Sequence, residues 1–256
     1  MLNATSGTPS IGTNGSSING DVEINAPGRI YELVDNLTML GGFSITAGTL
    51  DVNGQTLSVG NAEDVVDIFG TLNVSTASKP GGTLALGNDV QVVVNPGGEI
   101  NLVGTGAFPA RLTSTGVTDY LFTVTGTSMN PGLIGARNYI IEYIGTDGIF
   151  INDNTIIDAT NNFSDGTFLN GFSGGKYLRI ENDQDLSGGN RIENIVFDDN
   201  PGGGAVNIEK ATATSGSIEV FNYSGGFSGD DFDNDPNDLI TWLAPCLLYT
   251  SPSPRD

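Results

Sequence analysis

Short runs of alternating polar and apolar residues, each introduced by a turn, fill the chain from about Phe43 onward. One polar residue is followed by one apolar residue, which is the two-residue period of a strand with one buried face. The pattern therefore predicts many short strands joined by glycine-rich turns. The clearest runs are GTLDV at 48–52, GTLNV at 70–74, GTLAL at 82–86 and GEINL at 98–102, and QTLSVG at 55–60 and VQVVVNPGG at 90–98 continue them.

The second half of the chain repeats the pattern with longer excursions between strands, in units at 138–152, 176–182, 191–210 and 216–229. Similar apolar pairs recur in these units at separations that suit one coil of a three-sided helix, which predicts stacking between successive coils. The predicted stacks join Leu178 and Ile180 to Val206 and Ile208, and Ile195 and Phe197 to Ile218 and Val220.

Short strands with Gly-Gly, Asn-Gly and Pro-Gly turns are typical of either a β-sandwich or a parallel solenoid. The recurring short pattern, the asparagines near turns and the variety of turns favour the solenoid. Residues 40–229 resemble the right-handed parallel β-helix proteins of the pectin-lyase-like superfold, in particular secreted repeat proteins of environmental bacteria. The resemblance implies an all-β fold, a right-handed parallel β-helix over 21–245, with a β-sandwich as the alternative.

Three segments differ from this pattern. Residues 1–20 are rich in Ser, Gly, Thr and Asn and are predicted to be a linker or a frayed terminus. The apolar spacing of 30–40 is compatible with either a helix or a strand. Residues 246–256, CLLYTSPSPRD, resemble the translated sequence of a short-read sequencing adapter, so we expect a non-native tail on a chain truncated near Pro245.

Charge narrows the range of partners. The chain has 30 acidic residues and 9 basic ones, giving a net charge of −21. Because phosphate neutralisation needs clustered basic residues, we expect no nucleic-acid partner. No apolar run is long enough for a membrane-spanning helix, and the first ten residues lack the features of a signal peptide. A polysaccharide or another surface protein is the expected partner of a monomeric segment from a larger chain.

Catalytic residues are scarce. The chain contains no histidine, and its single cysteine, Cys246, lies in the predicted tail. The resemblance implies two enzymatic possibilities, but a polygalacturonase-like site would need a Gly-His-Gly segment that is absent. A lyase-like site would combine acidic Ca²⁺ ligands with a basic residue that abstracts a proton. The candidates are Asp198, Asp199, Arg179 and Arg191, together with Glu193 and Lys176; the other interpretation is that these charged residues form solvated ladders.

The segment GDDFDNDPND at 229–238 is the most distinctive acidic motif. Asp231, Asp233 and Asp235 alternate as in a calcium loop, and Asp238 follows them. However, Pro236 replaces the expected turn glycine, and Trp242 stands where a bidentate Glu is expected. The motif thus predicts a weak calcium site or a solvated acidic loop, and no other cofactor is expected.

These observations favour a non-catalytic structural, adhesive or glycan-binding β-helix segment of a secreted or cell-surface bacterial protein. The alternative is a polysaccharide lyase or hydrolase that acts on acidic polysaccharide. The enzyme hypothesis requires Asp198, Asp199 and a basic residue to converge in an open groove. The structural hypothesis requires them to be dispersed over a regular surface.

Overall fold

The structure is a computed structural model that describes residues 9–60 and 64–244. Almost every element is a strand, and all of the strand ladders are parallel. Helical structure in the described residues consists of two short 3-10 turns, η1 (Gly188–Asn190) and η2 (Asp230–Phe232). The prediction of an all-β fold is therefore confirmed. Parallel pairing also argues against the β-sandwich alternative, which is built from antiparallel sheets.

The largest sheet has 13 strands in two rows, which meet at one long strand, β5 (Phe43–Asp51). The first part of β5 pairs with β7 and its last part pairs with β8. The first row continues through β7 (Val65–Ile68), β10 (Gln91–Val94), β13 (Tyr120–Val124), β16 (Ile144–Ile151), β19 (Lys176–Ile180) and β22 (Val206–Glu209). The second row contains β8 (Thr71–Ser75), β11 (Glu99–Val103), β14 (Leu133–Arg137) and β17 (Ile156–Ser164), and β3 (Val22–Leu33) and β1 (Ser10–Ile11) precede β5.

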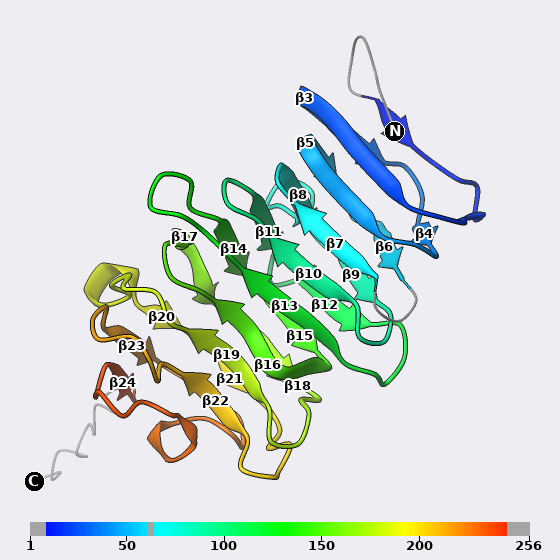
Figure 1. Cartoon of the computed structure of the whole chain (residues 1–256). Helices are drawn as coiled ribbons and strands as arrows, with labels where there is room; N and C mark the ends of the chain where they lie inside the picture. The colour runs from blue at the N-terminus through cyan, green and yellow to red at the C-terminus, as the bar shows by residue number, and fades with distance from the viewer. Residues whose placement is uncertain (1–8, 61–63, 245–256) are drawn as a thin grey trace, which may run out of the picture.

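A third row and a short sheet complete the arrangement, and from β7 to β18 each pass of the chain adds one strand to each of the three rows (Figure 1). The third row contains β2 (Ser17–Ile18), β4 (Leu37–Met39), β6 (Thr56–Val59), β9 (Thr83–Leu86), β12 (Ala110–Ser114), β15 (Tyr139–Glu142), β18 (Thr167–Leu169) and β21 (Val196–Phe197). The short sheet contains β20 (Ile192–Glu193), β23 (Ile218–Phe221) and β24 (Ile240–Leu243).

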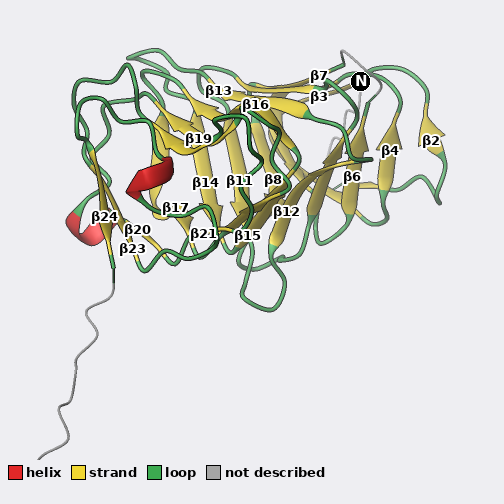
Figure 2. Cartoon of the chain, turned by 90° about the horizontal axis from the view of Figure 1, so that it is seen from below, coloured by secondary structure: helices red, strands yellow, loops and turns green. Residues whose placement is uncertain are grey.

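The rows of strands surround the interior of the stack (Figure 2). One continuous apolar core fills this interior. Inward side chains repeat at matching register positions, because a strand side chain pointing inward lies directly above its equivalent in the next coil. In the third row these residues are Leu37, Leu57, Leu84, Leu112, Ile141, Phe168 and Phe197, all of which are buried. The core thus changes from leucines to aromatic rings toward the C-terminus.

The structure corrects one local prediction, for residues 1–20, and decides between the two alternatives left open for 30–40. Residues 10–11 and 17–18 are strands paired with β3 and β4, because Ile11 and Ile18 pack against the core, so the described part of 1–20 is not a free linker. The segment 30–40 is strand rather than helix, contributing to β3 and forming β4. The tail at 246–256 lies outside the described residues.

The predicted stacking partners are also wrong. Leu178 pairs with Ile208 rather than Val206, a shift of two residues that keeps both side chains inward. Phe197 is the predicted partner of Val220, but Ile192 is the residue that pairs with it. Two-residue shifts preserve the alternation, so the apolar pattern alone cannot distinguish the registers.

Gly82 allows close contact between neighbouring segments and provides a first test of the fold. A Cβ atom at this position would lie 1.7 Å from the backbone carbonyl oxygen of Val74. We expect Gly82→Ala to lower the free energy of unfolding by about 1–3 kcal/mol, the usual cost of overpacking. Urea unfolding measures the change. Gly106→Ala is the matched control, since its Cβ would meet nothing within 4 Å, and equal losses in both variants would contradict the predicted contact.

Candidate functional site

A bulge in β17 produces the main irregularity on the surface of the second row. Ile134 of β14 pairs with Ile157, but Ala136 pairs with Asn162, so four residues of β17 protrude between these pairs. Asp158 holds the protrusion in shape, because its carboxylate accepts hydrogen bonds from the backbone N–H groups at 160 and 161, at 2.9 and 2.7 Å. Bulges of this kind commonly redirect side chains next to functional sites.

The bulge, η1 and β20 border a polar groove of about 580 Å³. Its lining comes from three successive coils, which places residues far apart in the sequence around one opening. Both basic and acidic side chains contribute, along with hydroxyl and amide groups. The lining residues are Arg137, Ala159, Thr160, Asn162, Ser164, Gly188, Gly189, Asn190, Arg191 and Glu193.

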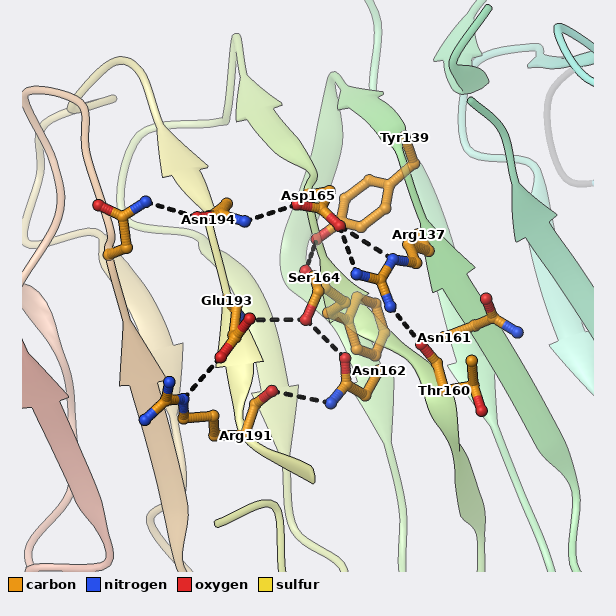
Figure 3. A network of polar contacts seen from close by, with 12 residues as sticks. Arg137, Tyr139, Thr160, Asn161, Asn162, Ser164, Asp165, Arg191, Glu193 and Asn194 are labelled. Carbon is orange, nitrogen blue, oxygen red and sulfur yellow. Dashed lines mark hydrogen bonds and ion pairs between the residues drawn. The ribbon is translucent and has the colours of Figure 1, made fainter. Parts of the chain in front are cut away.

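Arg137 is fixed on one side of the polar groove (Figure 3). Its Nε donates to Asp165 Oδ2 at 2.9 Å, and its Nη2 lies 2.7 Å from the same oxygen. Its Nη1 donates to the carbonyl oxygen of Thr160 at 2.9 Å, which ties the guanidinium to the bulge. Asp165 also accepts a hydrogen bond from Asn194 at 2.7 Å. This coil-to-coil chain of polar contacts orients the guanidinium and neutralises its charge.

Asn162 and Ser164 form the floor between the two walls. The Ser164 hydroxyl donates to Asn162 Oδ1 at 2.7 Å and accepts the backbone N–H of Glu193 at 2.9 Å. Asn162 Nδ2 donates to the carbonyl oxygens of Asn190 and Arg191, at 2.6 and 2.9 Å. Both side chains are buried, so these bonds satisfy groups that would otherwise be costly to bury. They also fix β20 beside β17, where no strand ladder joins the two.

Arg191 forms the opposite wall. Its guanidinium carbon lies 4.0 Å from the ring centroid of Phe221, and its Nε donates to Glu193 Oε1 at 2.7 Å. Within the described residues, no hydrogen bond or ion pair involves its two terminal nitrogens. Arg191 is therefore held in place by the ring and the carboxylate while its terminal N–H groups remain available as donors.

The groove is balanced in charge, since Arg137 pairs with Asp165 and Arg191 pairs with Glu193. Paired guanidinium and carboxylate groups, with amides and hydroxyls between them, offer both donors and acceptors to a ligand. Such an arrangement can bind a ligand rich in hydroxyl groups. It contains no pair of groups arranged as a nucleophile and its base.

The structure does not bring the predicted catalytic residues together. Arg179 belongs to β19 in the first row, where its Nε contacts Glu181 at 3.2 Å and Glu209 at 3.1 Å. Its guanidinium lies over Phe150. Lys176 also pairs with Glu209, at 3.7 Å. These contacts match the interpretation of the charged residues as ladders on a sheet face.

Asp198 and Asp199 follow β21 in the third row, away from both arginines in the strand order. Asp198 is exposed. Asp199 accepts hydrogen bonds from the Tyr177 hydroxyl at 2.5 Å and the backbone N–H of Asn170 at 2.8 Å. Burial, reinforced by the bond to Asp199, raises the pKa of Tyr177. Asp199 therefore anchors a turn to the aromatic core.

The acidic loop uses its carboxylates internally. Asp233 Oδ2 accepts the Trp242 indole N–H at 2.7 Å, and Asp235 Oδ2 accepts the backbone N–H of Ile240 at 2.5 Å. Asp231 and Asp238 are exposed. In the described part of the chain, no group of three or more carboxylates is placed to hold a metal ion. Calcium binding at this loop stays a prediction.

A pH-dependent contribution to stability follows from Asp233. Burial, with the nearby charges of Asp230, Asp235 and Asp238, raises its pKa to about 6. The folded state therefore favours the protonated form, and this contribution is lost as the pH rises from about 4 through 6. We expect Asp233→Asn to stabilise the protein at pH 7 by about 1 kcal/mol, allowing for solvent screening, and to have little effect at pH 4.

Thermal unfolding of Asp233→Asn and the unchanged protein between pH 4 and 8 measures this effect. Asp231→Asn is the control, because Asp231 is exposed. A constant difference across the whole pH range would contradict the raised pKa.

Sequence reasoning identified Arg191 and Glu193 but missed Arg137, Asn162 and Asp165. A signal exists in the spacing, since Arg137 and Asp165 are 28 residues apart, as are Asn194 and Asn222. These separations equal one coil. The bulge in β17, by contrast, has no clear signature, because its residues resemble those of any polar turn.

Two further observations concern membranes and relatives. None of the described helices is long and apolar enough to cross a membrane. Comparisons with protein-family models, with curated proteins and with solved structures give no significant match.

Proposed function

We propose that this chain is a non-catalytic segment of a right-handed parallel β-helix protein of the pectin-lyase-like type. In this proposal it is a monomeric part of a larger secreted or cell-surface bacterial protein, and its polar groove binds a polysaccharide. The addition of one strand to each of three rows at every pass from β7 to β18 supports the β-helix assignment. The proposal also treats 246–256 as an adapter-derived tail.

The balanced charge of the groove is the observation that carries the binding proposal. A protein with a net charge of −21 repels polyanions at long range. Within the groove, each arginine is already neutralised by a carboxylate, so little attraction remains to offset this repulsion. Hydroxyl groups of a neutral sugar can instead accept from Arg191 and donate to Glu193. We therefore infer a neutral polysaccharide as the ligand.

Calorimetric titration with soluble neutral polysaccharides (a glucan, a xylan and a mannan) tests the proposal, with polygalacturonate as the acidic comparison. We expect saturable binding to at least one neutral polymer. Arg191→Ala should weaken binding about tenfold or more, because a hydrogen bond from a charged donor contributes about 1.5–3 kcal/mol.

Arg179→Ala is the matched control. Arg179 also lies over an aromatic ring and pairs with a carboxylate, but it belongs to another row and does not line the groove. Equal losses of affinity in both variants, or no binding to any neutral polymer, would overturn the proposal. Cleavage of polygalacturonate would instead support the lyase alternative, and added Ca²⁺ tests whether that activity needs the acidic loop.

A further inference from the structure

Lys210 is the most unusual basic residue among those the structure describes. It follows β22 and is fully buried, whereas Lys79 and Lys176 are partly exposed and each pairs with a carboxylate. The only hydrogen bond of its Nζ to the described residues goes to the backbone carbonyl oxygen of Asn182, at 2.6 Å. An ammonium group has three N–H donors, so this site is poor in partners for a charged lysine.

The side chain of Asn182 lies at the same buried position, one coil earlier. Its Nδ2 donates to the carbonyl oxygen and the hydroxyl of Thr155, at 3.2 and 3.4 Å. Its Oδ1 is buried without a hydrogen-bond partner in the described residues. The amide is therefore held by its nitrogen, while its Oδ1 is left unsatisfied in the same residue whose backbone carbonyl oxygen accepts from Lys210.

Asp235 supplies a carboxylate close to Lys210. The backbone N–H of Lys210 donates to the carbonyl oxygen of Asn234 at 3.0 Å, which brings Asp235 beside the lysine. Asp235 Oδ2 accepts the backbone N–H of Ile240, but its Oδ1 is buried without a partner in the described residues. Two orphaned oxygens thus belong to residues that adjoin one buried amine.

Burial lowers the pKa of Lys210, and the charges of Asp183, Glu181, Asp235 and Asp153 oppose this effect only partly. The amine therefore loses its proton more readily than an ordinary lysine, which makes it a better nucleophile. The carboxylate of Glu181 is already occupied by the N–H groups of Thr212 and Ala213. Asp235 is thus the carboxylate with an oxygen free to transfer a proton.

We propose that Lys210 and Asn182 form an intramolecular isopeptide bond. The neutral Nζ attacks Cγ of Asn182, and Asp235 moves a proton from Nζ to Nδ2. The bond between Cγ and Nδ2 then breaks and releases ammonia, leaving an amide between Nζ and Cγ. No oxidant or other reactant is needed. The bond joins two adjacent coils covalently near the C-terminal end of the described stack.

Intact-mass measurement of the full chain tests the proposal directly. We expect a mass lower than that calculated from the sequence by one ammonia. Trypsin should fail to cleave after Lys210, and the peptide 180–191 should remain linked to the peptide that begins at Ile192. The full calculated mass, with normal cleavage after Lys210, would overturn the proposal. Loss of water instead of ammonia would also overturn it, since the acceptor would then be a carboxyl group.

Three variants assign the roles. Lys210→Arg keeps a positive charge but cannot form the bond, so it should have its full calculated mass. Asp235→Asn keeps both reacting residues and should remain mostly unlinked. Asp183→Asn is the matched control, because it removes a nearby but exposed carboxylate, and it should be linked as in the unchanged chain. A linked Asp235→Asn variant would contradict the role of Asp235.

Discussion

Phe168→Ala is expected to lower the free energy of unfolding by about 3–5 kcal/mol, the cost of a large cavity in a core that cannot collapse. Phe168 is fully buried in β18. Its ring lies 5.5 Å from that of Tyr139, 5.6 Å from Tyr177 and 5.3 Å from Phe197, measured between centroids. One substitution therefore removes contacts across three coils.

Urea unfolding followed by circular dichroism measures this loss. Phe108→Ala is the control, because Phe108 is 61% exposed and its removal should change the free energy by about 0.5 kcal/mol or less. If the two variants were equally stable, the aromatic core between the rows would be wrongly placed.

Glu181→Ala is expected to have a similarly large effect, about 3–5 kcal/mol at pH 7, because it removes a buried carboxylate on which several donors and an arginine depend. Glu181 is only 3% exposed. Its Oε2 accepts the backbone N–H and the hydroxyl of Thr212, at 2.8 and 2.6 Å, and the N–H of Ala213 at 3.0 Å. Its Oε1 contacts Arg179.

The effect of Glu181 depends on pH in a definite direction. Burial alone would raise its pKa, but the hydrogen bonds from Thr212, Ala213 and Arg179 outweigh burial and lower it. A lowered pKa gives stability that is present above the ordinary pKa of glutamate and is lost as the pH falls through the folded-state value. The difference between Glu181→Ala and the unchanged protein should therefore shrink in acid.

Unfolding free energies at pH 7 and at pH 3 measure both parts of this prediction. Asp185→Ala, an exposed carboxylate on the same loop, is the control and should change stability little at either pH. A loss at pH 7 no larger than that of the control would contradict the buried network.

The sequence predicted the strands well, because each one carries its own evidence. The alternation in GTLNV and GTLAL requires one buried face, and Leu72, Val74, Leu84 and Leu86 are indeed buried. Pairing between coils is harder to predict, because any shift of two residues satisfies the same alternation. The true partner of Leu178 is Ile208, two residues beyond the one that the apolar pattern suggests.

The polar groove could be predicted only in part. Arg191 and Glu193 lie at and beside a predicted strand, and their charges made them candidate site residues. Arg137 and Asp165 come together because they are 28 residues apart, which is the length of one coil here. The bulge in β17 also changes the local register, and the apolar pattern does not indicate either feature. Asn162, Phe163 and Ser164 are all buried, with Asn162 and Ser164 lining the groove, and strict alternation along the strand cannot indicate this.

A crystal structure of the chain with a bound neutral oligosaccharide, from a polymer that titration identifies, tests the central claim most directly. We predict parallel strand rows and a sugar in the groove between β17 and β20, with hydroxyl groups within hydrogen-bond distance of Arg191 and Glu193. Antiparallel sheets would contradict the fold. An ordered sugar bound on another face, with the groove filled only by water, would contradict the proposed binding site.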